Sequence, residues 1–331
     1  CIRDSDSLMF DRKGRESTDS RSFYFFGDWR RVNLPCPLSP GPQGRDVLNM
    51  VRRLGLSDLY SRIQEAADFI GARTSIRPEY GLILGTGLGK LAARIEDPVS
   101  IPYGEVPHFV ESTATSHDGN LVLGTLEGRA VCVMQGRTHY YEGYSMEEIT
   151  LPVRVMKALG AHSLIMSNAV GGMNPKDRPG DIGVIVDHIN FMGDNPLIGP
   201  NDERLGPRFP DMSEPYDRGY IALCDEVALE QRLALRHFVY VAVAGPNLET
   251  AAEYRFLRLL GADTVGMSSV PENLVAVHGG LKVLGISVIT DACLPDNLHP
   301  ARVEDILKTA NEAQPKLEAL VTGFLRKAPR P

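Results

Sequence analysis

The chain has 331 residues, of which 43% are hydrophobic, and its formal net charge is −7 at pH 7. This length and composition can build a substantial hydrophobic core, whereas the negative charge argues against a nucleic-acid backbone or an anionic membrane as the main partner and favours a small-molecule ligand. No apolar run approaches the roughly 18 residues that a membrane-spanning helix needs. The five scattered cysteines form no C-x-x-C pair, which predicts buried thiols in a cytoplasmic protein.

Residues 1–45 differ in character from the rest of the chain. They mix Arg, Asp, Ser and Gly without periodicity and end in the turn-rich stretch 35–42. Interspersed acidic residues argue against a transit peptide, and the segment lacks the apolar run of a secretory signal. The chain begins with Cys1, and Met50 stands just before the first amphipathic helix. We therefore expect residues 1–45 to be a disordered or non-native extension.

From residue 48 onward, helix-like and strand-like segments alternate. Apolar residues have helical spacing from Leu48 to Phe69, and the short apolar run Tyr80 to Leu84 is followed, after a glycine loop, by a helix through Ile95. Ser145 to Glu148 and Thr250 to Glu253 have the form of a capping box, which marks the start of a helix. Further strand-like runs are Leu121 to Leu123, Val131 to Met134, Leu164 to Met166, Ile182 to Val186, Phe238 to Val243 and Leu281 to Ile289.

This alternation predicts an α/β fold in which a mixed or mostly parallel central sheet is flanked by helices on both sides. Because no linker interrupts residues 50–325, we expect a single domain, assigned to residues 46–328.

The first strand-like run stops at the loop Gly85-Thr86-Gly87-Leu88-Gly89. Backbone N–H groups of such a loop, with the Thr86 hydroxyl and the positive end of a following helix, can bind a phosphate. The spacing fits neither common phosphate-loop motif, because Lys90 occupies the last glycine position of one and is followed by Leu91 in the other. A plain tight turn is an equally good interpretation of this loop taken alone.

Anion-binding side chains recur at later strand ends. His117 lies in a turn-like stretch and is either a solvated histidine or part of a site. The decapeptide Gln135 to Tyr144 concentrates polar and aromatic side chains directly after an apolar run, where open α/β sheets bind ligands. Its Arg137 offers a bidentate fork, and His139 lies on the same side of an extended chain, so the two form a candidate oxyanion clamp.

Three later segments supply further candidates. Residues 167–175 combine small residues with paired glycines, which either permit close approach of a ligand to the backbone or form a structural turn. Glu249 stands directly before a capping threonine, where it either complements the helix dipole or contacts a ligand. Asp291 ends an apolar strand, a position at which a carboxylate commonly has a function or makes a cap.

A hydroxyl-rich loop contains Ser268 and Ser269. Ser269 and Glu272 have the form of a third capping box, so a cap is the simpler interpretation of Ser269. That interpretation applies less to Ser268, which we keep as a candidate ligand contact.

Nine motifs carry a resemblance to a known family. In chain order they are GTGLG, SHDG, QGRTHYYEGY, NAVGGMNP, DHIN, GPRFPDMS, AGPNLETAAE, GADTVGMSSVPE and SVITD. This series resembles the trimeric class of purine nucleoside phosphorylases over about residues 50–325. The resemblance implies one α/β domain around a central mixed sheet, a homotrimer, and cleavage of purine ribonucleosides and deoxyribonucleosides with inorganic phosphate. It implies phosphate as co-substrate and no metal or organic cofactor.

The resemblance also assigns roles by matched position. For phosphate it implies Thr86, His117, Arg137, His139, the Ala169 amide and Ser268. For ribose it implies Tyr141, Met267 and the position of Val303. For the base it implies Leu248, Glu249, Asp291 and, from the neighbouring subunit, Phe209. The residues expected to be catalytic are His139, Glu249 and Asp291.

Three departures from the family pattern bear on the substrate. Asp291 stands where many relatives have Asn, Leu248 replaces a frequent Phe, and Val303 occupies the position of a histidine that contacts the ribose 5′-hydroxyl. Asp291 with Val303 is also the combination of the related methylthioadenosine phosphorylases, which are the alternative. Glu249 matches the members of the family that act on 6-oxopurines, in which this carboxylate accepts a hydrogen bond from the ring N–H of the base. We therefore expect 6-oxopurines to be preferred. A non-catalytic nucleotide-binding module is a third possibility.

Overall fold

The computed structural model describes residues 58–85, 88–113 and 119–330. Its helices are α2 (Leu59–Gly71), α3 (Met146–Leu159), α4 (Arg218–Glu230), α5 (Ala251–Leu259), α6 (Val270–His278) and α7 (Val303–Lys327). Short 3-10 helices are η1 (Gly89–Arg94), η2 (Tyr103–Glu105), η3 (Tyr140–Glu142) and η4 (Pro295–Asn297). The expected extension at residues 1–45, the first part of the helix expected from Leu48, Thr86 and His117 lie outside the described residues.

The strands form one nine-stranded mixed sheet in the order β2-β3-β4-β1-β5-β8-β7-β6-β9. Their bounds are β1 (Tyr80–Leu84), β2 (Glu96–Pro102), β3 (Asn120–Leu126), β4 (Arg129–Gln135), β5 (Ser163–Gly172), β6 (Ile182–Phe191), β7 (Leu235–Val243), β8 (Thr264–Gly266) and β9 (Lys282–Ala292). Strand β1 is parallel to β4 and β5, whereas β3 is antiparallel to β2 and β4. The additional pairing of β5 with β9 closes the strands β5, β8, β7, β6 and β9 into a circuit.

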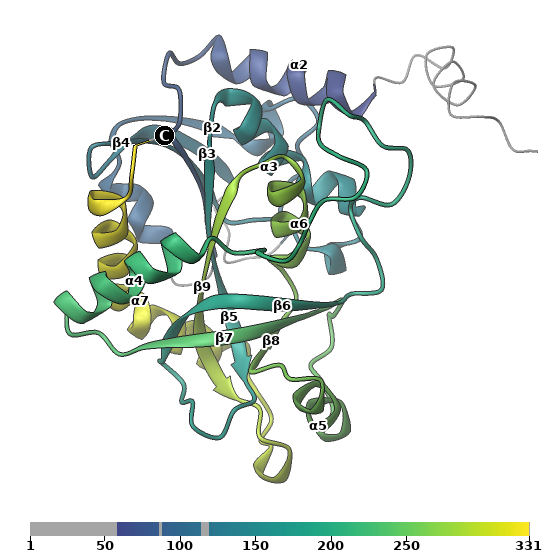
Figure 1. Cartoon of the computed structure of the whole chain (residues 1–331), viewed down its shortest axis with the longest axis vertical. Coiled ribbons are helices and arrows are strands. Elements are labelled where there is room, and N and C mark those ends of the chain that lie inside the picture. The colour runs from purple at the N-terminus through teal and green to yellow at the C-terminus, as the bar shows by residue number, and fades with distance from the viewer. Residues whose placement is uncertain (1–57, 86–87, 114–118, 331) are drawn as a thin grey trace, which may run out of the picture. The chain divides into compact units, whose positions relative to one another are not determined.

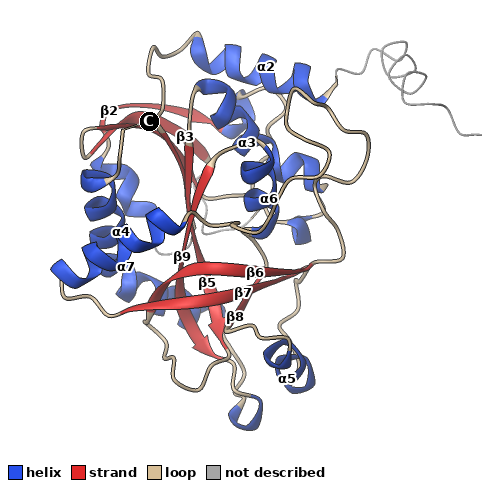
Figure 2. Ribbon diagram, viewed as in Figure 1, coloured by secondary structure: helices blue, strands red, loops and turns tan. Residues whose placement is uncertain are grey.

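Helices cover both faces of this sheet (Figure 2). On one face, α2, α3 and α6 pack with the sheet around a core that includes Ile63, Val155 and Leu274. On the other face, α4 and α7 pack around a second core that includes Tyr220 and Phe324 (Figure 1). Every residue of β1 is buried, as expected for a strand covered on both faces. The predicted α/β domain with a central mixed sheet between helices is therefore confirmed.

Two predicted helix starts are confirmed in detail. Ser145 caps α3, because its hydroxyl accepts from the Glu148 amide and the Glu148 carboxylate accepts from the Ser145 amide. Thr250 and Glu253 make the same reciprocal pair at the start of α5. Each cap fixes the direction in which the chain leaves a loop of the site described below.

The helix predicted after the glycine loop is a six-residue 3-10 helix, η1, rather than a full α-helix. Its aligned peptide dipoles are too few to build the positive end that the sequence argument placed behind a phosphate. The helix α6, which begins directly after Ser268 and Ser269, is longer than η1. Its N-terminus therefore provides the stronger positive helix end.

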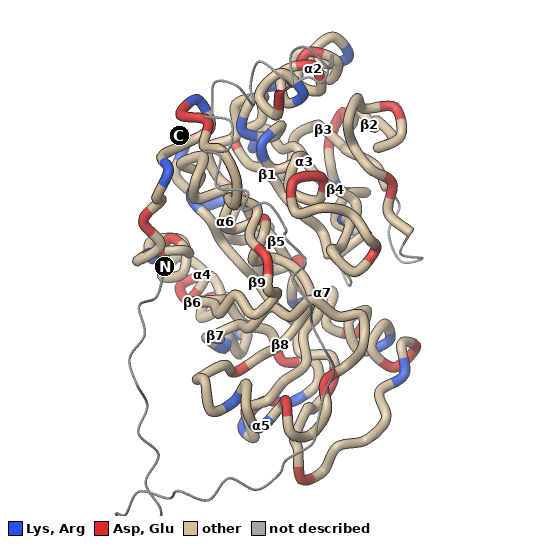
Figure 3. Tube along the Cα trace, turned by 90° about the vertical axis from the view of Figure 1, so that its right-hand side faces the viewer, with Lys and Arg blue, Asp and Glu red and all other residues tan. Residues whose placement is uncertain are grey.

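Charges of both signs are interspersed along the described part of the chain (Figure 3). Where α7 ends, for example, Arg326 pairs with Glu127 and Lys327 pairs with Glu226 and Glu230. Among the described residues, no helix combines the length and apolarity that crossing a membrane would require.

Candidate active site

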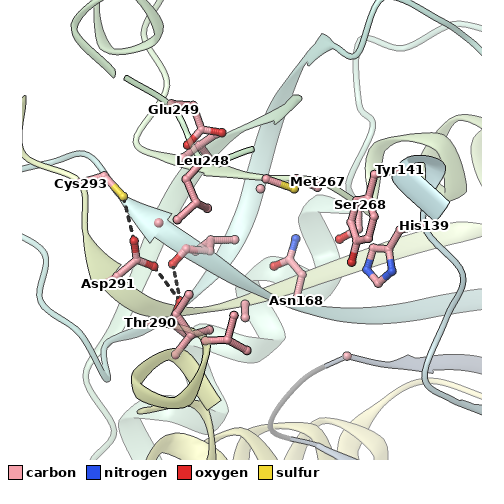
Figure 4. Close-up of a pocket in the computed structure, with 18 of the residues that line it drawn as sticks. His139, Tyr141, Asn168, Leu248, Glu249, Met267, Ser268, Thr290, Asp291 and Cys293 are labelled. Carbon is pink, nitrogen blue, oxygen red and sulfur yellow. Dashed lines mark hydrogen bonds between the residues drawn. The ribbon is translucent and has the colours of Figure 1, made fainter. Parts of the chain in front are cut away.

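A cavity of about 270 Å³ opens where several strands of the sheet end. Its walls come from the carboxyl ends of β1, β4, β5, β8 and β9, from the loop after β7 and from the start of α7. His139, Tyr141 and Ser268 lie toward one end in Figure 4, and Thr290, Asp291 and Cys293 lie toward the other, with Asn168 and Met267 between them. Ligands of open α/β sheets bind at this edge of the strands.

Arg137 lines the cavity and is held by a buried network. Its Nη1 lies 3.0 Å from Glu272 Oε1 and 3.1 Å from Ser269 Oγ, and its Nη2 donates to the Ser167 carbonyl oxygen. The side chains of Arg137 and Glu272 are 3% and 5% exposed, so the two charges offset each other out of contact with solvent. The guanidinium is therefore fixed in one orientation at the cavity wall.

Ser269 does not cap α6 as its sequence pattern predicts. It has a φ of 69° and makes no side-chain capping bond; its hydroxyl instead accepts from Arg137 and from Asn168 Nδ2, the latter at 3.0 Å. Glu272, the expected partner in the capping box, pairs with Arg137. A buried arginine competes successfully for both groups because an uncompensated charge in the interior would cost more than an unsatisfied helix amide.

His139 and Tyr141 form a stacked pair beside the cavity, with ring centroids 4.8 Å apart. Glu142 orients the imidazole, because its Oε1 lies 3.2 Å from His139 Nδ1 and accepts from the His139 amide at 2.6 Å. Burial raises the pKa of Glu142, but hydrogen bonds from Thr113 and His139 outweigh burial and leave the pKa below its ordinary value. An ionised carboxylate thus holds the ring in place.

The loop after β8 places Met267 and Ser268 at the centre of the site. The buried Tyr240 hydroxyl donates to the Ser268 carbonyl oxygen at 2.9 Å and lies 3.2 Å from the Ser268 amide nitrogen. Gly245 passes so close to Met267 that a β-carbon there would lie 2.3 Å from the methionine sulfur. The position of this loop is therefore set by a buried phenol and by a glycine on the neighbouring strand end.

A β-bulge directs Asp291 into the cavity. Val170 pairs with Ile289 whereas Gly171 pairs with Asp291, so Thr290 is the extra residue in β9. Both carboxylate oxygens of Asp291 have donors: the Thr290 hydroxyl lies 2.9 Å from Oδ1, and the Cys293 sulfur lies 3.0 Å from Oδ2. The bulge thus places a carboxyl group and its two hydrogen-bonding partners at one end of the site.

Glu249 is half-buried and lies near the same end, with Leu248 and Tyr254. Burial raises its pKa, hydrogen bonds from its own amide and from the Tyr254 hydroxyl act against burial, and the charge of Asp291 adds to the rise. The net shift is upward, so this carboxyl binds a proton at higher pH than an exposed glutamate does.

The structure brings most of the predicted site residues together. Those that line the cavity are Arg137, His139, Tyr141, Ala169, Leu248, Glu249, Met267, Ser268, Asp291 and Val303. Phe209 is not among the lining residues and is 87% exposed in the loop before α4. Thr86 and His117 lie outside the described residues, so their predicted roles remain predictions.

Sequence reasoning missed five residues that shape the site, namely Asn168, Tyr254, Ser269, Glu272 and Cys293. Asn168 and Ser269 belong to motifs that the sequence already identified, so their polarity at strand ends was the available signal. The sequence contains no signal that assigns Tyr254 or Cys293 to a site, because an aromatic residue in a helix and a single cysteine are most often core residues. Among the described residues, no group of three or more His, Cys, Asp or Glu side chains is arranged to hold a metal ion.

Comparisons with known proteins find relatives over most of the chain. Residues 79–326 match the model of the phosphorylase superfamily. The chain is 51% identical over 265 residues to purine nucleoside phosphorylase 1 of Bacillus subtilis, covering 80% of this chain and 95% of that protein. Two solved structures of purine nucleoside phosphorylase from schistosomes are similar: a complex with adenosine (TM-score 0.78, 40% identity) and one with inosine (TM-score 0.79, 38% identity). Each covers 82% of this chain and 98% of the solved chain.

Proposed function

This chain belongs to the purine nucleoside phosphorylases of the phosphorylase superfamily, and we propose from that premise that it cleaves purine ribonucleosides and deoxyribonucleosides with a preference for 6-oxopurines. The enzyme is a pentosyltransferase that uses inorganic phosphate as co-substrate. The observation that carries the proposed preference is Glu249 in the cavity, because a carboxylate there accepts the ring N–H that a 6-oxopurine has and adenine lacks.

The proposed phosphate subsite lies at the end of the cavity where His139 and Ser268 lie (Figure 4), and we assign Arg137, which also lines the cavity, to it. The Ala169 amide and the nearby N-terminus of α6 add neutral donors and a positive helix end. We propose that Thr86 and His117, both outside the described residues, complete this subsite. Because Glu272 already offsets the charge of Arg137, the guanidinium acts as an oriented donor more than as an unpaired cation.

Tyr141 and Met267 form the proposed ribose subsite between phosphate and base. A phosphate oxygen forms a bond to the anomeric carbon as the bond from that carbon to N9 of the purine breaks. The sugar passes through a state with oxocarbenium character, which the neighbouring phosphate stabilises. The products are (deoxy)ribose 1-phosphate and the free base.

The departing purine takes up negative charge and needs a donor at N7. Asp291 is the proposed donor, in its protonated form, because a carboxylate without a proton can only accept. Glu249 holds the opposite edge of a 6-oxopurine by accepting from N1–H.

Asp291 and Val303 also favour a second candidate, methylthioadenosine phosphorylase. An ionised Asp291 accepts from the 6-amino group of adenine, and Val303 presents an apolar side chain at the cavity where a 5′ substituent would lie. Glu249 weighs against this candidate, because adenine leaves its carboxylate without a ring N–H, at a cost of about 1–3 kcal/mol.

The proposed assembly is a homotrimer in the cytoplasm. Phe209 supports the trimer, because a large aromatic side chain that is 87% exposed has its best use against another subunit. In this arrangement Phe209 would close the cavity of the neighbouring subunit.

The decisive experiment measures release of free base from inosine, guanosine, adenosine and methylthioadenosine, each with and without inorganic phosphate. Phosphate-dependent cleavage of inosine or guanosine in preference to the other two is the expected result. Cleavage of methylthioadenosine alone would instead assign the chain to the second candidate. If none of the four nucleosides is cleaved, a non-catalytic nucleotide-binding module is the remaining interpretation.

A further inference from the structure

Cys293 is a buried thiol at the base end of the cavity whose sulfur lies 3.0 Å from Asp291 Oδ2. It is 1% exposed and is one of the residues that line the cavity. Gly171 leaves room for it, since a β-carbon at that position would lie 2.5 Å from the cysteine sulfur. The Cys293 amide also donates to the Gly172 carbonyl oxygen at 2.8 Å, which anchors the residue to β5.

The sulfur carries a proton under ordinary conditions. Burial is the main cause that raises the pKa of the Cys293 thiol, and the charge of Asp291 raises it further. A thiol has a single hydrogen to donate, and its two polar neighbours are the Asp291 carboxylate and the Tyr254 hydroxyl. The carboxylate is the stronger acceptor, so the S–H hydrogen is directed to Asp291. The Tyr254 hydroxyl in turn has the Glu249 carboxylate as its acceptor.

Thr290 can form a hydrogen bond with Asp291 in either protonation state of the carboxyl group, whereas Cys293 favours the ionised state. The Thr290 hydroxyl lies 2.9 Å from Asp291 Oδ1 and 3.3 Å from the Val170 carbonyl oxygen. If Asp291 is protonated on Oδ1, Thr290 can accept from it and donate to Val170 instead. Donation from Cys293, by contrast, requires an acceptor oxygen and so stabilises the ionised carboxylate.

We propose that Cys293 is a positioning residue that sets the range of bases: its S–H bond to Asp291 favours the acceptor form that a 6-aminopurine needs over the protonated, donating form that a 6-oxopurine needs. An ionised Asp291 accepts from a 6-amino group, whereas a protonated Asp291 donates to the acceptors of a 6-oxopurine. Cys293 thus acts through Asp291 without touching the base. This proposal rests on the function proposed above.

The test compares kcat/KM for inosine with kcat/KM for adenosine in the unmodified protein and in two variants. Cys293→Ala removes a donor that only an acceptor oxygen of Asp291 can use, and it should raise the inosine to adenosine ratio by roughly fivefold. Cys293→Ser substitutes a stronger donor and should leave the ratio at or below its original value. Because a ratio of two substrates on one preparation does not depend on the folded fraction, loss of stability alone cannot produce this pattern.

Cys224→Ala is the matched control, since Cys224 is a fully buried thiol in α4 that does not line the cavity. Its ratio should equal that of the unmodified protein. Calorimetric titration with hypoxanthine and adenine gives the same comparison from binding alone, so that it remains informative if the protein proves inactive and the proposed function fails. An unchanged ratio in Cys293→Ala, or equal shifts in the Ala and Ser variants, in turnover or binding, would overturn the proposal.

Discussion

Glu249 and Asp291 put two carboxyl groups in a single cavity, where the proposed function gives them different roles toward a base. Under the proposed function, replacing Glu249 with Ala leaves the N1–H of a bound 6-oxopurine without an acceptor. Inosine and guanosine kcat/KM should therefore fall on the order of a hundredfold or more, by loss of a charged hydrogen bond in a desolvated site. Steady-state phosphorolysis assays measure this effect.

A matched control for this prediction is Asp296→Ala. The Asp296 side chain is 90% exposed in η4, close in sequence to the site, and pairs with Arg255 at the surface. Its removal should leave inosine turnover within about twofold of normal. Near-normal inosine turnover in Glu249→Ala would contradict the assignment of this residue to the base.

The buried pair of Arg137 and Glu272 yields a prediction about stability. Glu272→Ala leaves the guanidinium without its carboxylate in a site where both side chains are almost inaccessible. The free energy of unfolding should fall by about 3–5 kcal/mol, because the substitution removes the carboxylate that offsets a desolvated charge. Urea denaturation followed by circular dichroism measures it.

Glu312→Ala provides the comparison, since Glu312 pairs with Lys308 at 3.9 Å on the exposed face of α7. Loss of a surface pair should change the free energy of unfolding by about 1 kcal/mol or less. Equal effects of the two substitutions would mean that solvent reaches the Arg137 pair in solution.

At the residue scale, the sequence predicted which side chains gather but not how they are held. Arg137 and Glu249 stand out locally because charged residues interrupt the ends of apolar runs. The partner of Arg137 could not be inferred, because Glu272 lies 135 residues further along the chain and has the form of a capping residue. Only the pairing of β4 with the sheet brings the two together.

Helix starts were predictable at the scale of single elements wherever the necessary interactions are local. Ser145 accepts from the Glu148 amide at 3.3 Å, and Ser145→Ala should lower the free energy of unfolding by about 1 kcal/mol. Denaturant titration of the variant gives the value. Replacement of the α3 cap by Ala removes only an interaction within four residues of chain, so the substrate ratios should stay unchanged.

Thr309→Ala is the control for that cap, because Thr309 lies inside α7 and its hydroxyl donates to the Asp305 carbonyl oxygen at 2.9 Å. Alanine has the higher helix propensity, so this substitution should be neutral or stabilising by a few tenths of a kcal/mol. A loss as large as that of Ser145→Ala would show that removal of any helical hydroxyl, rather than of a cap, explains the effect.

The failure of the third capping box shows where local patterns stop being sufficient. Ser269 and Glu272 have the same spacing as Ser145 and Glu148, yet both turn toward Arg137. The 3-10 helix η1 is a second example, because its sequence has helical apolar spacing but packs as a short turn against β4. In both cases a contact distant in sequence decides the local conformation.

At the scale of the whole molecule, the fold class was predictable and the strand order was not. Buried runs such as β1 and β9 have a clear apolar signal, whereas β2 is largely exposed and β8 has only three residues. The closure of β5 onto β9 joins segments about 120 residues apart, as in the register of Ser163 with Lys282. That closure, with its bulge at Thr290, is what brings Asp291 to the cavity.

Phe209 supports a prediction that concerns the assembly. The loop that carries it is anchored, since Arg208 Nη1 donates to the carbonyl oxygens of Leu197 at 3.2 Å and Gly199 at 2.8 Å. A fixed loop with an exposed aromatic tip is suited to enter a neighbouring subunit. Phe209→Ala should therefore raise KM for inosine by roughly tenfold, while light scattering should give the mass of the proposed trimer. Leu229→Ala on α4, where Leu229 is 79% exposed, should leave KM unchanged.

Trimers that contain both Phe209→Ala and Glu249→Ala subunits can show whether Phe209 contributes to the cavity of a neighbouring subunit or to the cavity of its own subunit. Phe209→Ala subunits keep Glu249, and Glu249→Ala subunits keep Phe209, so each variant alone has damaged sites. If Phe209 closes the neighbouring cavity, trimers reassembled from both variants contain some cavities with an intact Glu249 and a Phe209 from the next subunit. The mixture should then recover inosine turnover at low substrate concentration beyond the average of the two variants. Turnover equal to that average, or a monomeric mass for the unmodified protein, would place Phe209 outside the site and leave each cavity complete within its own chain.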